Sequence, residues 1–184
     1  MPHSLNIDGV SESLFVIQTL AHGSKSFCDT HQIKWGEEAA SEFQWDYYFG
    51  WLKSLLCEHL IRSSIMLRML QDIVTAQEQD GLDLSLIEAS AMSGLSLGTV
   101  SQGGFSLTLR ESFNKIIHAT DTLLVWEDSG DSEFWTGRII LTGRFRASEW
   151  KLELDVINFC IAANRFVESV GGEVDWDRLY KYDH

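Results

Sequence analysis

The sequence predicts a mainly α protein, a helical bundle that carries one β-hairpin inserted before its last long helix. Three observations lead to this prediction. Apolar residues recur every three or four positions over several long stretches, which is typical of amphipathic helices. Residues 122–146 instead hold β-branched and aromatic residues on either side of a polar turn. A length of 184 residues allows one hydrophobic core, so we expect a single domain over residues 1–184.

Two long amphipathic segments come first along the chain. Residues 11–27 are expected to form a helix because apolar side chains recur there at near-helical spacing. The longer stripe over residues 37–79 predicts either one helix or two helices that meet near Gly50. Glu37 and Glu38 would lie at its N-terminus, where carboxylates interact favourably with the helix dipole. Only packing against other helices would bury a stripe of this length.

The middle of the chain changes in composition. Residues 90–106 contain five serines and four glycines without a sustained period, so we expect a flexible Gly/Ser-rich loop. Neither glycine pattern of the common phosphate-binding loops occurs there. Thr108 and Glu111 then match a capping box, which predicts a short helix to about Ala119.

The β-hairpin insertion is expected over residues 122–146, with strands at 122–126 and 134–146. A polar, glycine-containing turn joins them. Ser148 can cap a last long helix to about Val170, and the glycine pair at 171–172 is expected to end it.

The net charge limits the possible partners. The chain holds 27 acidic and 14 basic residues, so its formal charge is −13. This charge disfavours bulk binding to RNA, DNA or anionic membranes and leaves only a local patch for any nucleic acid. Residues 107–151 are nearly neutral, with seven acidic and six basic groups. No membrane-spanning stretch, leader or CxxC pair is visible, so we expect a cytoplasmic protein with reduced thiols.

The helix after residue 108 carries the main candidate site. Arg110, Asn114 and His118 follow one another at intervals of four, so they share one stripe of the helix. A guanidinium, an amide and an imidazole together can hold a phosphate and move a proton near neutral pH. The alternative is that Asn114 and His118 are polar groups that tie the helix to its neighbours.

The segment Asn114-Lys-Ile-Ile-His-Ala119 resembles the signature region of HEPN-domain proteins. Many of these are RNA-cleaving toxins or defence nucleases, built as helical bundles that usually dimerise and that carry an Arg a few residues before a His. Asn114 and His118 match the Asn and His of that motif, but Phe113 stands at the Arg position and Arg110 lies a turn earlier. The resemblance therefore implies a homodimer that acts as a binding or dimerisation module.

Two further groups of residues are candidate binding residues. Glu58, His59 and Arg62 lie within one turn of the long helix, with Glu58 and Arg62 spaced to form an ion pair. They would complete a pocket if their helix faced His118; otherwise they form a solvated face. Arg138, Arg144 and Arg146, followed by Lys151, form the only local concentration of basic residues, which is either a phosphate-facing ribbon or a charged strand edge.

No HxxxH or HExxH spacing is present, so neither a metal nor another cofactor is expected. Three functions remain open. The first is a cytosolic HEPN-like binding or regulatory module, a homodimer with a possible protein partner, of a bacterial defence or toxin–antitoxin system. The second is a metal-independent endoribonuclease that uses Arg110, Asn114 and His118. The third is an acidic immunity or adaptor protein that binds a basic partner.

Overall fold

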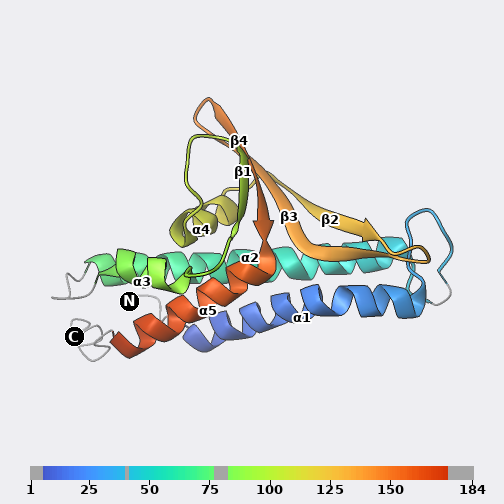
Figure 1. Cartoon of the computed structure of the whole chain (residues 1–184), viewed down its shortest axis with the longest axis horizontal. Coiled ribbons are helices and arrows are strands. Elements are labelled where there is room, and N and C mark those ends of the chain that lie inside the picture. Colours follow the sequence, from blue (N-terminus) through green and yellow to red (C-terminus); the bar gives the residue numbers. More distant parts are fainter. Residues whose placement is uncertain (1–5, 40–41, 77–82, 174–184) are drawn as a thin grey trace.

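The computed structural model describes residues 6–39, 42–76 and 83–173. In these segments the chain forms five helices and one four-stranded antiparallel sheet (Figure 1). The protein is therefore a mixed α/β fold, and the prediction of a mainly α bundle with a single hairpin is wrong. The predicted hairpin exists, but two further strands extend it into a sheet.

The elements follow one another in a fixed order along the chain. They are α1 (Ile7–His31), α2 (Trp45–Ala76), α3 (Leu84–Ala91), β1 (Gly98–Gln102), α4 (Leu109–Ile117), β2 (Asp121–Asp128), β3 (Glu133–Phe145), β4 (Ser148–Asp155) and α5 (Val156–Glu173). The strand order in the sheet is β1-β4-β3-β2, so the C-terminal hairpin β3–β4 lies at its centre.

Both long helices predicted at the start of the chain are present, with different bounds. Helix α1 begins where the Asn6 side chain accepts a hydrogen bond from the backbone N–H of Gly9 at 2.9 Å. Helix α2 is continuous through Gly50 and begins at Trp45. Glu37 and Glu38 therefore lie in the preceding connection rather than at a helix start. Residues 77–79, the end of the predicted helix, lie outside the described residues.

Strand β4 occupies the place of the first turns of the predicted last helix. Side chains are buried there at every second position, which is the period of a strand: Trp150, Leu152 and Leu154. The expected helix start at Ser148 is wrong, because Ser148 pairs with Phe145 across a two-residue turn. Helix α5 begins after Asp155, whose carboxylate accepts a hydrogen bond from the backbone N–H of Asn158 at 2.9 Å.

Residues 90–106, expected to be a flexible loop, contain the end of α3 and the edge strand β1. Gly98 pairs with Leu154 of β4 in the left-handed half of backbone space, at a φ of 143°. A Cβ at this position would overlap the carbonyl oxygen of Glu153. The glycine that indicated a loop is therefore the residue that lets β1 approach β4.

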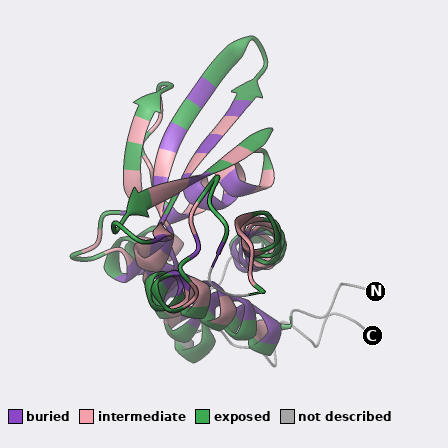
Figure 2. Ribbon diagram, turned by 90° about the vertical axis from the view of Figure 1, so that its right-hand side faces the viewer, coloured by how far each residue is buried: buried purple, intermediate pink, exposed green. Residues whose placement is uncertain are grey.

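The sheet and the long helices share one hydrophobic core. Helix α1 packs against α2, α5 and β3, and β3 and β4 contribute buried residues at alternate positions. Figure 1 shows the β3–β4 hairpin rising away from the helical layer with α4 beside it, and Figure 2 shows that the hairpin tip is exposed. A second cluster joins α1, the connection after it, the start of α2 and Phe134 of β3. Next to it the Trp45 ring lies 4.5 Å from the ring of Trp126 on β2. No helix within the described segments is long and apolar enough to span a membrane.

Candidate functional site

Helix α4 lies between α2 and the β3–β4 hairpin, and its sequence explains this position. Thr108 accepts a hydrogen bond from the backbone N–H of Glu111 at 3.1 Å, as the capping-box prediction requires at the helix start. Leu109, Phe113 and Ile116 are buried, and the Phe113 ring packs edge-on against Phe159 of α5 at 5.8 Å. Phe113 is thus a core residue, and its buried ring cannot take part in chemistry at the surface.

The other side of α4 faces an open cleft of about 680 Å³ between the helix and the hairpin. The residues that line it come from the loop before α4, from α4 itself and from both hairpin strands: Gly103, Gly104, Phe105, Glu111, Asn114, Lys115, His118, Arg144, Phe145, Ser148, Glu149 and Trp150. A smaller hollow of about 490 Å³ adjoins it and shares Arg144, Glu149 and Trp150. Candidate residues from α4 and from the hairpin therefore meet in one place.

Lys115 is the central charge of the cleft. Its side chain is only 12% exposed and its ammonium group lies 3.0 Å from the carboxylate of Glu111. The same ammonium lies 4.1 Å from the ring centre of Phe105 and 4.7 Å from that of Trp150. Two aromatic faces and one carboxylate thus hold this cation in place.

The mouth of the cleft is polar and exposed. His118 ends α4 and its imidazole forms no hydrogen bond with any residue of the described segments, so it is free to meet a ligand. Arg144 of β3 and Glu149 of β4 form an exposed ion pair at 3.0 Å between the two hollows. Phe145 is 66% exposed at the end of β3. An imidazole, a guanidinium and an aromatic ring therefore line the same cleft and are accessible there.

Arg110 and Asn114 do not join His118 as a catalytic group. Arg110 does not line the cleft, because its guanidinium turns to α2, 3.0 Å from the Asp72 carboxylate. Asn114 accepts a hydrogen bond from Arg68 Nε at 3.1 Å. Partial burial raises the pKa of Asp72, but hydrogen bonds from Arg68 and Arg110 outweigh this and hold that pKa below its usual value. These side chains tie α4 to α2, which is the alternative that the sequence left open.

The predicted Glu58, His59 and Arg62 group lies elsewhere on α2. His59 Nδ1 is 3.3 Å from the Ser13 hydroxyl, so this turn of α2 faces α1. Arg68, which does contact α4, lies nine residues later, about 13 Å further along the helix axis. The expected ion pair between Glu58 and Arg62 is not formed, and neither side chain has another ionic partner among the described residues.

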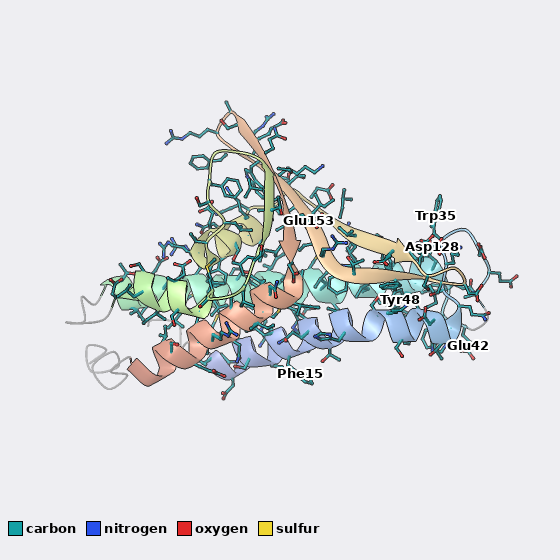
Figure 3. The ribbon with its side chains drawn as sticks, viewed as in Figure 1. Phe15, Trp35, Glu42, Tyr48, Asp128 and Glu153 are labelled. Atoms are coloured by element: carbon teal, nitrogen blue, oxygen red, sulfur yellow. The ribbon has the colours of Figure 1, made fainter. Side chains whose placement is uncertain are left out.

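The three hairpin arginines have different surroundings. Arg138 pairs with Glu153 at 3.1 Å and does not line the cleft. Figure 3 shows Glu153 near the base of the hairpin, away from the tip. Arg146 occupies the turn with a φ of 56°, and its guanidinium lies 5.4 Å from the Phe145 ring centre. Of the three, only Arg144 lines the cleft, and Arg146 lies beyond it in the hairpin turn.

Of the residues that line the cleft, the sequence reasoning named only Asn114, His118 and Arg144 as site residues, and it missed the central group of Lys115, Phe105 and Trp150. Lys115 had a readable signal, since it follows Glu111 at the spacing of a helical ion pair. Phe105 and Trp150 had none, because their contact with Lys115 depends on how the chain folds back.

Within the described segments no three His, Cys, Asp or Glu side chains gather closely enough to hold a metal ion. Comparisons of the chain with protein-family models, curated proteins and solved structures give no match. The function must therefore be argued from the cleft itself.

Proposed function

We propose that the protein is a cytoplasmic, homodimeric binding module whose cleft takes a ligand that carries a phosphate and a flat ring, such as a nucleotide or the end of an RNA. One observation carries this proposal. The exposed aromatic ring of Phe145 and the local positive charge of a strongly acidic chain meet at the same cleft.

The positive charge is local. The charged residues of the two hollows and of the hairpin turn are Lys115, Arg144, Arg146 and Lys151 against Glu111 and Glu149, four cations against two anions, in a chain of formal charge −13. Arg146 and Lys151 have no ion pair with any described residue. An anionic group that approaches the protein is therefore attracted to this end and repelled elsewhere. A phosphate there gains charged hydrogen bonds without first displacing a carboxylate from either cation.

The ring of the ligand has partners in the same place. Phe145 offers an exposed face, and Phe105 and Trp150 line the interior of the cleft. Stacking of a base on an aromatic side chain contributes about 1–3 kcal/mol and tolerates any base. This combination supports binding of a nucleotide unit and gives little discrimination between sequences.

Binding is favoured over cleavage because only His118 of the three candidate catalytic residues is available. Arg110 forms an ion pair with Asp72, and Asn114 accepts a hydrogen bond from Arg68. Catalysis would require Arg144 to act in place of Arg110 beside His118. The resemblance of residues 114–119 to HEPN proteins supports a role in a bacterial defence or toxin–antitoxin system. The acidic remainder of the surface would then meet a basic protein partner.

The experiment is a titration of end-labelled short RNA and of nucleoside monophosphates, followed by fluorescence anisotropy and calorimetry. Arg144→Ala is expected to weaken binding about tenfold, since one charged hydrogen bond contributes about 1.5 kcal/mol. Arg138→Ala is the matched control, because it also removes a cross-strand ion pair between β3 and β4 but lies outside the cleft. Equal loss in both variants, or no binding by the wild type, contradicts the proposal.

The same samples distinguish the enzyme alternative. RNA recovered after incubation in EDTA is expected to be intact on a denaturing gel. Cleavage that disappears in His118→Ala would instead establish a metal-independent nuclease.

A further inference from the structure

Helix α2 is apolar on two opposite sides. One side lies in the core, with Leu52, Leu56, Leu60, Leu67, Leu70 and Val74 buried. The other side exposes large apolar side chains, which we call the α2 stripe: Tyr47 (59% exposed), Trp51 (55%), Leu55 (41%), Ile61 (44%) and Ile65 (40%). A helix that is apolar all round is normally covered on all sides. The stripe side of α2 is uncovered in the single chain.

The five side chains of the α2 stripe share one side of the helix, with the polar residues Ser54, Glu58 and Arg62 between them. At about 100° per residue these five fall within an arc of about 120°, opposite the buried side, over about 27 Å of helix. The rings of Tyr47 and Trp51 already stack on each other, 5.8 Å apart. Together the five side chains expose on the order of 500 Å², if full side chains present about 150–250 Å² each. A stable interface covers about 800 Å² per partner, so the stripe supplies more than half of one.

The charge of α2 indicates what covers the stripe. Its acidic residues Asp46, Glu58 and Asp72 equal its basic residues Lys53, Arg62 and Arg68 in number, three against three. The rest of the chain then carries the whole formal charge of −13. Two copies of this acidic protein repel each other at most orientations, but not when α2 meets α2. A basic partner would find stronger attraction elsewhere on the surface.

The middle of the stripe is self-complementary. In an antiparallel pair of identical helices, residue i lies opposite residue j with a constant sum i + j. When the two-fold axis crosses α2 at the level of residue 60, on the stripe side, Leu55 lies opposite Ile65 of the partner subunit. In the same register Glu58 lies opposite Arg62 of the partner subunit, and Arg62 lies opposite Glu58 of the partner subunit. Glu58 and Arg62 are exposed and have no ionic partner among the described residues of their own chain. The guanidinium of Arg62 lies beside Gly9 at the start of α1, so it must turn away from α1 to make this contact.

We infer that the α2 stripe binds the α2 stripe of a second copy, antiparallel and two-fold symmetric, with reciprocal Glu58–Arg62 ion pairs between the subunits. This inference rests on the homodimer of the proposed function and not on the ligand of the cleft. Helix α4 packs against α2 through Arg68 and Asp72, so α4 and the cleft lie toward one end of the contact and not at its centre.

The test reverses each charge of the reciprocal pair. In a dimer of Glu58→Arg, both ion pairs between the subunits are replaced by pairs of arginines that repel each other. In a dimer of Arg62→Glu, both are replaced by pairs of carboxylates that repel each other. Each single variant is expected to raise the dimer dissociation constant at least tenfold in sedimentation velocity and light scattering. The double variant restores opposite charges and is expected to return to a mass near twice 20.9 kDa. Glu168→Arg on α5 is the control, because it makes the same charge change on an exposed helix outside the stripe.

The outcomes separate the two proposals. A dimer that both single variants leave intact overturns the choice of the α2 stripe while the homodimer stands. A wild-type protein that stays monomeric up to high concentration overturns both, and ligand binding at the cleft is judged by its own titration. Single variants that weaken the dimer without rescue by the double variant overturn the antiparallel register. Far-ultraviolet circular dichroism of each variant shows whether loss of dimer follows from misfolding.

Discussion

Gly143→Ala tests the closest packing in the cleft. Gly143 of β3 lies directly opposite Trp150 of β4, and the indole ring lies over the glycine. A Cβ at this position would come within 2.6 Å of Trp150 Cε2, closer still to Cζ2, and 3.0 Å from the carbonyl oxygen of His118. Trp150 is only 4% exposed, and the ammonium of Lys115 lies over its ring. The ring can therefore move only by displacing its neighbours.

The magnitude follows from two opposing terms. Carbon atoms pack at about 3.5–4.0 Å, so the indole must withdraw by about 1 Å. Overpacking of this size costs about 1–3 kcal/mol. Replacing glycine with alanine recovers about 0.4–1 kcal/mol by restricting the unfolded chain. The free energy of unfolding should fall by about 0.5–2 kcal/mol, which lowers Tm by roughly 2–8 °C for a chain of this length.

The assay is thermal unfolding of Gly143→Ala beside Gly104→Ala. Gly104 also lines the cleft, but a Cβ there would meet no atom within 4 Å, so its variant keeps only the gain from the unfolded state. The two Tm shifts should have opposite signs. A Tm for Gly143→Ala at or above that of Gly104→Ala would refute the tight packing of Trp150 on β3.

Three further predictions concern the helices and their connections. Gly50→Ala should stabilise the protein by about 1 kcal/mol in urea unfolding, because Gly50 lies inside α2 with open space around it. Ser64→Ala should raise the free energy of unfolding by about 1 kcal/mol, since this buried hydroxyl has no partner among the described residues. Ser63→Ala should not raise the free energy of unfolding, since the Ser63 hydroxyl donates a hydrogen bond to the His59 carbonyl at 2.7 Å. Hydrogen bonds from two serine hydroxyls, Ser132 first, hold the pKa of Asp29 below its usual value, so its stabilising contribution is present above about pH 4 and lost on further acidification. Urea midpoints of Asp29→Asn and wild type should therefore differ at neutral pH and converge in acid, and a constant gap would contradict this.

Local patterns predicted α1, α2, α4, most of α5 and the first hairpin, because each of these satisfies its hydrogen bonds within a short segment. The short helix α3 was not predicted. Strand β4 was readable in part, since its buried residues alternate from Trp150 to Leu154, but Leu152 also fits the helical spacing that continues into α5. Strand β1 was not readable, because Gly98 and its neighbours form a strand only by pairing with β4. Because β1 and β4 pair over a long separation in the sequence, the protein contains a four-stranded sheet where the sequence predicted a helical bundle with one hairpin.

The candidate site shows the same limit. The spacing of Arg110, Asn114 and His118 on one stripe was correct, but the rotation of α4 against α2 directs Arg110 to Asp72 and leaves His118 in the cleft. The meeting of His118 with Arg144 depends on the fold of the hairpin over α4. Sequence reasoning found both residues and placed them in separate clusters.

The turn at the tip of the hairpin has a consequence for the balance between stability and function. Arg146 holds a φ of 56°, a conformation that costs a residue with a Cβ about 1–2 kcal/mol and costs glycine almost nothing. Arg146→Gly should therefore unfold at a higher temperature, while the hairpin turn next to the cleft loses an unpaired cation. Natural proteins often keep such a locally unfavourable residue where activity needs its side chain. The tip of the hairpin is then a position where the most stable residue and the most useful residue differ.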